Sequence, residues 1–354
     1  MNITSLNNFK KEVNQVKEYL KHIEIVDNII AYSILENDND QIKKILNNLK
    51  EHSNSFKRDK KIFEYKAAII SLYGLLEKYI ETWIKEYLES LCRVVRDYNE
   101  IDEIIKNNHF EFSLKLINSI ISRESAKYQA LTKEKVLEKL NNCIASPTNY
   151  QINTEAFVLL SGNLKHKKIV ELFKHININL NNELVKNENL NKEIGLSKDR
   201  ISHEDKDILY NKINDLVERR NQIAHGSETL EILGISALEP YVQFLEVYCQ
   251  AIFEALFENL IKQESKYAFQ KIEKIIKVYG NKILAFEVEN YTVKVGDMLI
   301  IEAQESRFFK KPILTIQLDS EEYQELRISE KTKIAISVEH KIKDNQKFYI
   351  VKKS

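Results

Sequence analysis

The chain has 354 residues, with 43% hydrophobic and 30% charged residues, which is the ordinary balance of a globular protein with a sizeable core and room for about two domains. Its 53 basic and 53 acidic residues give a formal net charge of zero, so net charge does not indicate a nucleic-acid partner. Any such partner must be bound by a local patch. With only 7 glycines and 3 prolines, the chain should consist largely of long helices.

The three cysteines, Cys92, Cys143 and Cys249, lie far apart in apolar surroundings. Their spacing predicts neither a disulfide framework nor a metal site and fits a reducing cytoplasm. Residues 1–4 lack the character of a signal peptide, and no apolar run approaches the roughly 20 residues that cross a bilayer. We expect a cytoplasmic protein with no membrane partner, no metal and no other cofactor.

The first part of the chain is expected to form a helical hairpin. Apolar residues recur with a 3.6-residue period over residues 7–35, a turn follows at Asn37–Asp40, and a shorter helix is expected over Ile42–Leu49. A coiled-coil hairpin explains this pair of helices better than a functional surface does. The hairpin is assigned to residues 1–58.

The middle of the chain is predicted to be helical. A long helix over residues 63–95 has an apolar face wide enough to be buried on more than one side, and shorter helices follow over 112–121, 133–143 and up to Phe173. Residues 177–200 are polar and rich in asparagine, which predicts a surface excursion that either gates a site or merely decorates the fold. His166, His175 and His203 lack ligand spacing and are expected to be solvated.

The most informative stretch is Glu218–Gly226, which is Glu-Arg-Arg-Asn-Gln-Ile-Ala-His-Gly. Apolar residues from Ile208 to Val217 recur at helical spacing, so the stretch lies on the last turns of an amphipathic helix, and Gly226 is expected to end that helix in the left-handed conformation. Arg220 offers a permanent charge and bidentate donors to phosphate, and His225 can exchange a proton near neutral pH. This pair suits chemistry on a phosphodiester.

The final quarter is predicted to change from helix to strand. Pro240 is expected to open a last long helix that continues past Ile276 and closes the bundle, and a two-residue period begins at Gly280. Five or six short strands in about 75 residues indicate a small closed β-barrel. The predicted fold class is therefore α+β and multidomain, with a hairpin at 1–58, a helical domain at 59–279 and a barrel at 280–354.

The motif Arg-Asn-x-Ile-Ala-His-Gly at residues 220–226 resembles the signature of HEPN ribonuclease domains, especially the branch of the RiboL-PSP and MAE-type HEPN proteins. Residues 67–81, with their apolar-plus-glutamate pattern, resemble the upstream helix of that branch, and the resemblance covers roughly residues 60–262. It implies a metal-independent endoribonuclease that works as a homodimer, built through the helical domain, with a composite site. It also suggests a setting of abortive infection or growth arrest, with a possible cognate antitoxin or defence partner.

In this interpretation His225 moves the proton of the 2′-hydroxyl or of the leaving oxygen, and Arg220 holds the phosphate. Asn221 binds substrate or fixes the imidazole, and Arg219 either contacts the substrate or belongs to a solvated face. Glu77 is a candidate to orient Arg220 or His225, since a carboxylate within a bundle needs a partner, whereas Glu81 fits a solvated edge. The products would be a 2′,3′-cyclic phosphate and a 5′-hydroxyl.

The tail carries a second resemblance. Residues 294–301 followed by 335–338 resemble the β-barrel domain after the GTPase domain of elongation-factor-Tu-like translation factors, although the sequence has no phosphate-binding loop. Arg307, Lys310 and Lys311 lie in an expected loop beside two phenylalanines, and could hold RNA, which suggests tRNA or another translation-related RNA as the target. Alternatively, the two phenylalanines pack into the barrel or against the helical domain.

Two other functions fit the sequence. The first is a non-catalytic HEPN scaffold or antitoxin-like module that binds RNA or protein. The second is a structural helical protein in which an arginine and a histidine occur at this spacing by chance.

Overall fold

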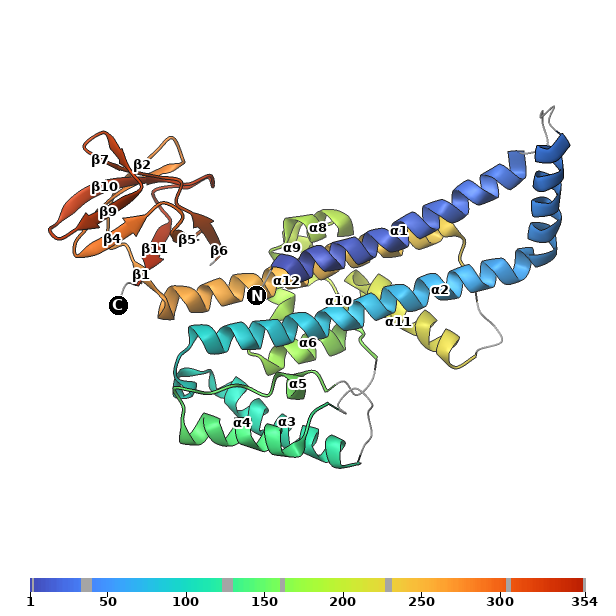
Figure 1. Cartoon of the computed structure of the whole chain (residues 1–354), viewed down its shortest axis with the longest axis horizontal. Helices are drawn as coiled ribbons and strands as arrows, with labels where there is room; N and C mark the ends of the chain where they lie inside the picture. Colours follow the sequence, from blue (N-terminus) through green and yellow to red (C-terminus); the bar gives the residue numbers. More distant parts are fainter. Residues whose placement is uncertain are drawn as a thin grey trace.

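The structure is a computed structural model that describes residues 1, 3–32, 40–122, 130–159, 163–226, 231–303 and 307–352. An elongated helical body is followed by a smaller β region at one end of the molecule (Figure 1). The predicted class, a helical bundle followed by a β region, is confirmed. No helix within the described ranges is long and apolar enough to cross a membrane.

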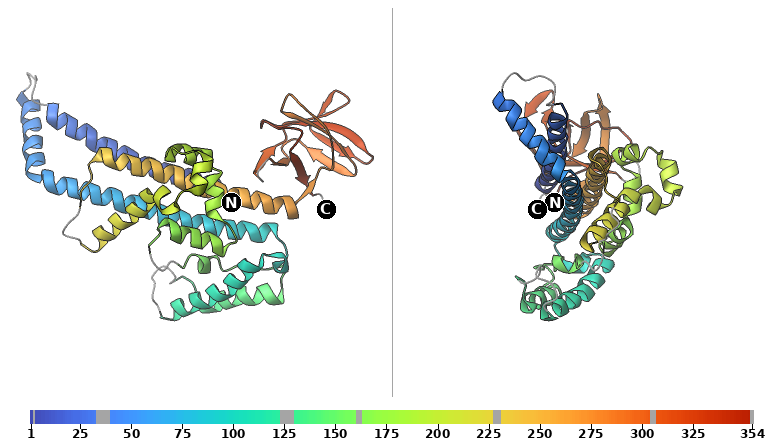
Figure 2. Two further views of the ribbon diagram at one scale, coloured as in Figure 1. Left: turned by 180° about the vertical axis from the view of Figure 1, so that it is seen from behind. Right: turned by 90° about the vertical axis from the view of Figure 1, so that its right-hand side faces the viewer.

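Three long helices lie side by side in the body: α1 (Ile3–Tyr32), α2 (Asp40–Val94) and α12 (Ile235–Tyr267) (Figures 1 and 2). Trp83 of α2 joins them, because its ring contacts Phe9 of α1 and Phe253 of α12 edge-on, with centroids 5.4 Å apart in each pair. The part of the apolar face of α2 around Trp83 is therefore buried between α1 and α12 within one chain.

Helix α2 is continuous, whereas the sequence predicted a short helix ending at Leu49 and a second one beginning near Phe63. Residues 40–73 contain no glycine or proline, so nothing in the backbone stops the helix. Its first turns nevertheless lie at a steep angle to the rest (Figure 1). The boundary expected after residue 58 falls inside this helix.

A side layer packs under α2. It contains the 3₁₀ turn η1 (Tyr98–Glu100) and the helices α3 (Glu103–Ser122), α4 (Lys133–Ala145) and α5 (Thr154–Phe157). Buried His109 links these segments, since its Nδ1 lies 3.1 Å from the Tyr98 hydroxyl and its Nε2 accepts the Asn153 N–H at 3.0 Å.

The asparagine-rich segment is part of the fold. It forms α7 (Leu180–Val185), α8 (Glu188–Ile194) and α9 (Lys198–His203), next to α6 (His166–His175), so the predicted excursion at 177–200 is wrong. Asn179 and Asn187 accept the backbone N–H groups of Asn182 and Leu190 as helix N-caps, which explains why so polar a segment is ordered. Three leucines of this segment are fully buried: Leu180, Leu184 and Leu190.

His166 was expected to be solvated, but it is buried. Its Nδ1 lies 2.8 Å from the Tyr248 hydroxyl, its Nε2 lies 2.8 Å from Asn181 Oδ1, and its ring stacks on Tyr210 with centroids 4.0 Å apart. Burial lowers the pKa of His166 to about 4, so this ring stays neutral at physiological pH. His175 is half-buried, and His203 is exposed as predicted.

The boundaries of α12 differ from the prediction at both ends. The helix begins at Ile235, so Pro240 lies in its second turn, and the helix ends at Tyr267 rather than beyond Ile276. Strands begin directly afterwards with β1 (Phe269–Lys271) and β2 (Lys274–Tyr279), so the β region starts about ten residues before Gly280.

The remaining strands are β3 (Ile283–Val288), β4 (Tyr291–Lys294), β5 (Met298–Glu302), β6 (Phe308–Pro312), β7 (Thr315–Leu318), β8 (Glu321–Tyr323), β9 (Glu325–Ile328), β10 (Thr332–Ser337) and β11 (Lys347–Val351). They form three antiparallel sheets in the orders β1-β11-β5-β6, β2-β3-β10-β7-β8 and β4-β9. Within the described strands these sheets do not close into the expected barrel, because each ends in strands with one neighbour.

Candidate functional site

The motif lies at the end of α11 (Asn211–Ala224). Ile213, Leu216 and Val217 bury one face of this helix against α2 and α12, which leaves the last turn beside α2. The His225 N–H caps the helix by donating to the carbonyl of Asn221, and Gly226 has a φ of 67°. The predicted left-handed glycine is confirmed, and it ends the helix directly after the histidine.

Arg219 is built into the fold. Its Nε donates to Asp215 Oδ2 at 2.7 Å, and its two terminal nitrogens donate to the Tyr65 hydroxyl and to the backbone oxygen and carboxylate of Glu231, each at 3.2 Å. Tyr241 also donates to Asp215. Burial acts to lower the pKa of Arg219, but its hydrogen bonds to Tyr65 and Asp215 raise it overall. With 12% of its side chain exposed, Arg219 does not belong to a solvated face, which was one of its two expected settings.

Arg220 has a different environment from its neighbour. Its Cζ lies over the ring of Tyr73 on α2, 4.2 Å from the ring centroid, and its Nη1 donates to Asn221 Oδ1 at 3.1 Å. Among the residues that the structure describes, no carboxylate forms an ion pair with Arg220. Its charge is therefore held by an aromatic face and an amide, neither of which neutralises it.

His225 is exposed at the helix end, and its contacts in the described part of the chain are made by its backbone. An exposed imidazole at this point is accessible to a substrate proton. Asn221, one of the candidate site residues, is bonded to Arg220 rather than to the imidazole. The structure thus brings Arg220 and Asn221 together, and places His225 one turn beyond Asn221.

Glu77 lies close to the site because it neighbours Tyr73 on α2. It lies one helical turn after Tyr73, so both occupy one face of α2. Burial, and then the negative charge of Glu77, raise the pKa of Tyr73, while the Arg220 charge lowers it. The described residues include no ion pair between Glu77 and Arg220. Glu81 is buried, which contradicts the expected solvated edge.

Tyr73 is the site residue that sequence reasoning missed. It belongs to the segment at 67–81 that carried the family resemblance, and its position four residues before Glu77 was a signal of a shared face. The contact with Arg220 is tertiary, so no spacing within either helix could have paired the two residues.

Lys310 and Lys311 lie in strand β6 rather than in a loop, and Arg307 directly precedes that strand. Lys310 of β6 pairs with Glu264 of α12 at 2.6 Å, and Arg307 pairs with Glu188 at 3.3 Å. Phe308 is buried and packs on Ile261 of α12. Lys311 is half-buried. Two of the three cations therefore contact the helical body. The phenylalanines follow the alternative of packing, Phe308 against the helical body and Phe309 within the β region, where its ring centroid lies 4.4 Å from that of His340.

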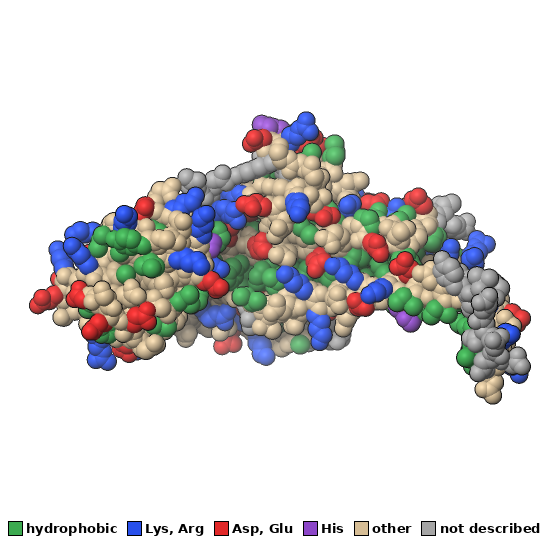
Figure 3. All heavy atoms as spheres, turned by 90° about the horizontal axis from the view of Figure 1, so that it is seen from above, with side chains coloured by type: hydrophobic (Ala, Val, Ile, Leu, Met, Phe, Trp, Pro, Cys, Tyr) green, Lys and Arg blue, Asp and Glu red, His purple; other side chains and the backbone are tan. Residues whose placement is uncertain are grey.

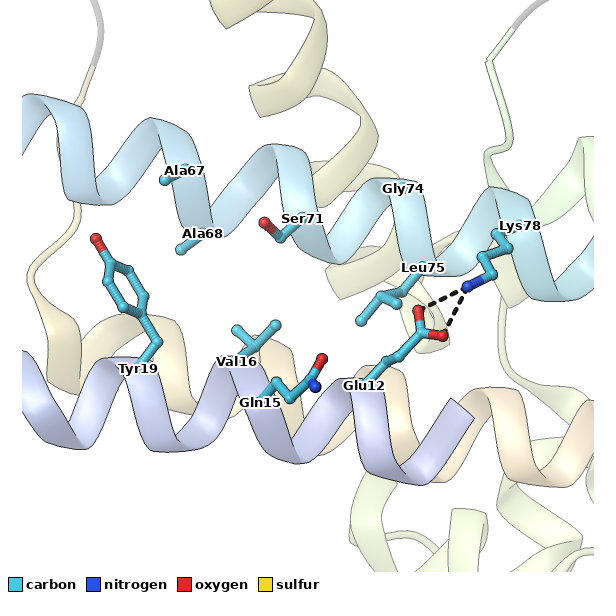
Figure 4. A pocket seen from close by; sticks show the side chains of 10 residues that line it. All are labelled: Glu12, Gln15, Val16, Tyr19, Ala67, Ala68, Ser71, Gly74, Leu75 and Lys78. Carbon is cyan, nitrogen blue, oxygen red and sulfur yellow. Dashed lines mark hydrogen bonds and ion pairs between the residues drawn. The ribbon is translucent and has the colours of Figure 1, made fainter. Parts of the chain in front are cut away.

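One surface groove lies away from the motif. A groove of about 420 Å³ lies between α1 and α2 and is lined by small residues such as Ala67, Ser71 and Gly74, with an ion pair of Glu12 and Lys78 at one end (Figure 4). Basic and acidic side chains are interspersed over the face in Figure 3. Within the described ranges, no group of three or more histidine, cysteine or acidic side chains is placed to hold a metal ion.

Comparison with known proteins identifies the family of the chain. No curated protein matches the chain significantly. The family model described as RiboL-PSP-HEPN matches residues 33–258, a span that contains α2, the motif helix α11 and most of α12. Because this match covers more than half of the sequence, the chain belongs to the RiboL-PSP-HEPN family.

Proposed function

We propose that this protein is a metal-independent endoribonuclease whose site is formed by Arg220, His225 and Asn221. The observation that carries the proposal is the contrast between two adjacent arginines. Arg219 is occupied by Asp215, Tyr65 and Glu231, whereas Arg220 lies on an aromatic ring with no acidic partner among the described residues. A guanidinium held in this way is free to bind a phosphate.

The chemistry requires a base, an acid and a cation. His225 accepts the proton of the 2′-hydroxyl, the 2′-oxygen attacks phosphorus, and the bond from phosphorus to the 5′-oxygen breaks. The leaving oxygen gains a proton, so the products are a 2′,3′-cyclic phosphate and a 5′-hydroxyl. Arg220 stabilises the charge that develops on the phosphate oxygens. One imidazole cannot accept and donate in the same step, so a second proton donor is needed.

We propose that a second copy of the chain supplies this donor, in a homodimer whose paired motifs form one site. Large apolar side chains are exposed along α2 at Ile42, Leu49, Phe56, Phe63 and Ile70, each seven residues apart. Phe63 is 67% exposed. A seven-residue apolar repeat favours pairing with another helix. The part of this row that follows the bend in α2 leads toward Tyr73 and supports a dimer formed by the helical body.

The proposed cellular setting follows from the proposed nuclease activity. Growth arrest or antiviral defence, with a cognate antitoxin or defence partner, agrees with a nuclease that must be restrained. The support for tRNA or another translation-related RNA came from the translation-factor resemblance, which is not confirmed, and from Lys310 and Arg307, which contact Glu264 and Glu188. We therefore restrict the substrate class to RNA.

A non-catalytic RNA-binding or scaffold role is the second candidate. One observation favours it: no described residue forms a hydrogen bond with the His225 ring that would orient it. A module that uses only the Arg220 charge to bind RNA would need no such bond.

The decisive experiment is incubation of the purified protein with total RNA in EDTA, with analysis of the product ends. Cleavage with cyclic phosphate ends is expected for the native protein and not for His225→Ala or Arg220→Ala. His203→Ala is the matched control, because His203 is an exposed histidine at the end of α9. Intact cleavage by a folded His225→Ala protein would refute the catalytic assignment. Binding without cleavage, together with unimpaired growth on overexpression, would favour the scaffold role.

A further inference from the structure

The contact between Tyr73 and Arg220 suggests a role for a residue outside the motif. Tyr73 is 3% exposed, so its ring is buried within the body, where α2 packs against α11. The Arg220 side chain is long and flexible, and an unsupported guanidinium loses rotational freedom when it binds a phosphate. A guanidinium already resting on a buried ring has lost part of that freedom beforehand.

An aromatic face supports a cation without occupying its N–H groups. A carboxylate partner would take these donors and neutralise the charge, as Asp215 and Glu231 do for Arg219. In Arg220, Nη1 donates to Asn221, and the ring contact leaves the other N–H groups directed along the guanidinium plane. Planar, bidentate donation to phosphate uses those groups.

The phenol must also remain neutral for this arrangement to work. A phenolate beneath Arg220 would form an ion pair with it and compete with the phosphate. A phenol of ordinary pKa keeps its proton at neutral pH. Burial and then the negative charge of Glu77 raise the pKa of Tyr73, which keeps the ring neutral although the Arg220 charge acts in the opposite direction.

We propose that Tyr73 is a positioning residue, which holds the Arg220 guanidinium in the orientation that receives an RNA phosphate. The inference rests on the proposed function and extends it to α2. The contribution comes from the ring rather than from the hydroxyl.

The test compares Tyr73→Phe, which keeps the ring, with Tyr73→Leu, which removes it. The full-length proteins are titrated with a 2′-O-methyl RNA, which lacks the nucleophile and reports binding alone. The cleavage kcat and KM are then measured on unmodified RNA. Tyr73→Phe should bind within about twofold of the native protein, whereas Tyr73→Leu should bind about tenfold more weakly. Its KM should rise more than its kcat falls.

Because Tyr73 is buried, loss of folding must be separated from loss of positioning. Tyr79→Leu is the matched control: Tyr79 is a buried tyrosine of the same helix that bonds to Glu12 and packs on Phe9. Both leucine variants should lower the melting temperature, but only Tyr73→Leu should weaken RNA binding. Equal weakening by both variants would mean a structural role and overturn the proposal.

A double variant shows whether Tyr73 acts through Arg220. The Tyr73→Leu effect on RNA affinity should disappear when Arg220 is already alanine. If the two effects multiply instead, or if Tyr73→Phe binds as weakly as Tyr73→Leu, the proposal is wrong. The binding assay is informative even without cleavage. If the protein binds RNA through Arg220 but does not cleave it, the proposed nuclease activity is wrong. The same titrations then still decide whether Tyr73 positions Arg220.

Discussion

Arg219 and Arg220 are adjacent in one helix but have different roles. The residues that surround each side chain determine whether it stabilises the fold or stays available to bind a phosphate. A helix rotates by about 100° per residue, so two neighbouring side chains reach different parts of the protein. Arg219 points toward Tyr65, Glu231 and Asp215, and its hydrogen bonds to them stabilise the fold. Arg220 reaches Tyr73 and keeps its charge available.

Arg219→Ala should therefore be a stability variant. It removes a donor to the Tyr65 hydroxyl and leaves Asp215 with Tyr241 but without its cation, which should lower the free energy of unfolding by about 1–3 kcal/mol. Urea denaturation monitored by circular dichroism measures this loss. Arg220→Ala should leave the unfolding midpoint nearly unchanged and abolish cleavage. A stable Arg219→Ala protein without activity would reverse these two assignments.

Two buried histidines predict a loss of stability in mild acid. Burial lowers the pKa of His109 and of His166 to about 4, whereas a histidine in an unfolded chain has a pKa of about 6.5. Between these values the unfolded chain binds more protons than the folded one, so stability is complete above pH 6.5 and falls as the pH drops toward 4. Each histidine should cost about 2 kcal/mol at pH 5.

The measurement is urea unfolding at pH 7.5 and pH 5.0. His166→Gln should show a smaller difference between the two conditions, by about the share of one histidine, although it is less stable at pH 7.5. His203→Ala, which changes an exposed histidine, should behave like the native protein. Equal stability of the native protein at both pH values would mean that these rings are not buried in the neutral form.

At the scale of elements, periodicity predicted helices well and their ends poorly. The apolar period located α1, α3, α4 and α11 because each buries one face. Pro240 was taken as the first residue of α12, yet five residues precede it in the helix. The early start of the β region was missed because burial does not alternate over residues 269–279. The buried residues Phe269, Ile272 and Val278 are three and six positions apart, which resembles helical spacing.

Composition misled most strongly at residues 177–200. Asparagine is common in loops, but here it caps short helices and leaves Leu180, Leu184 and Leu190 to pack against α12. Tertiary packing decided the outcome, and a single sequence does not contain it. The motif itself was found because its residues are close in sequence, whereas the ring under Arg220 lies almost 150 positions earlier in the chain.

Leu190→Ala tests whether α8 belongs to the core. Removing a fully buried leucine should lower the free energy of unfolding by about 2–5 kcal/mol, whereas the same change in a surface excursion would cost almost nothing. Asn189→Ala, one residue earlier and exposed, is the control and should have little effect. Urea unfolding of both variants gives the comparison. Equal free energies of unfolding for the Leu190→Ala and Asn189→Ala proteins would mean that this segment is a surface excursion after all.

At the scale of the whole molecule, the β region is held against the helical body by specific contacts. Phe308 and Phe269 pack on Ile261 of α12, the Phe308 N–H donates to Glu258 at 2.8 Å, and Lys310 pairs with Glu264. An apolar contact flanked by charged hydrogen bonds fixes an orientation as well as a position. The β region therefore behaves as an extension of α12 and lies apart from the motif (Figure 2).

The proposed dimer must then form through the helical body, and the apolar row on α2 makes a specific prediction. Light scattering of the native protein should give about twice the chain mass of 41.6 kDa. Phe56→Ser combined with Phe63→Ser should shift the protein toward monomer, because both side chains are exposed in the single chain and their loss costs the monomer little. Ile144→Ser, which changes a 72% exposed residue of α4 outside this row, should leave the dimer intact.

If the site is composite, cleavage should fall in proportion to the dimer at each protein concentration. A monomeric double variant with full nuclease activity would place both the base and the acid within one chain, and the search for the second proton donor would return to the residues around Arg220.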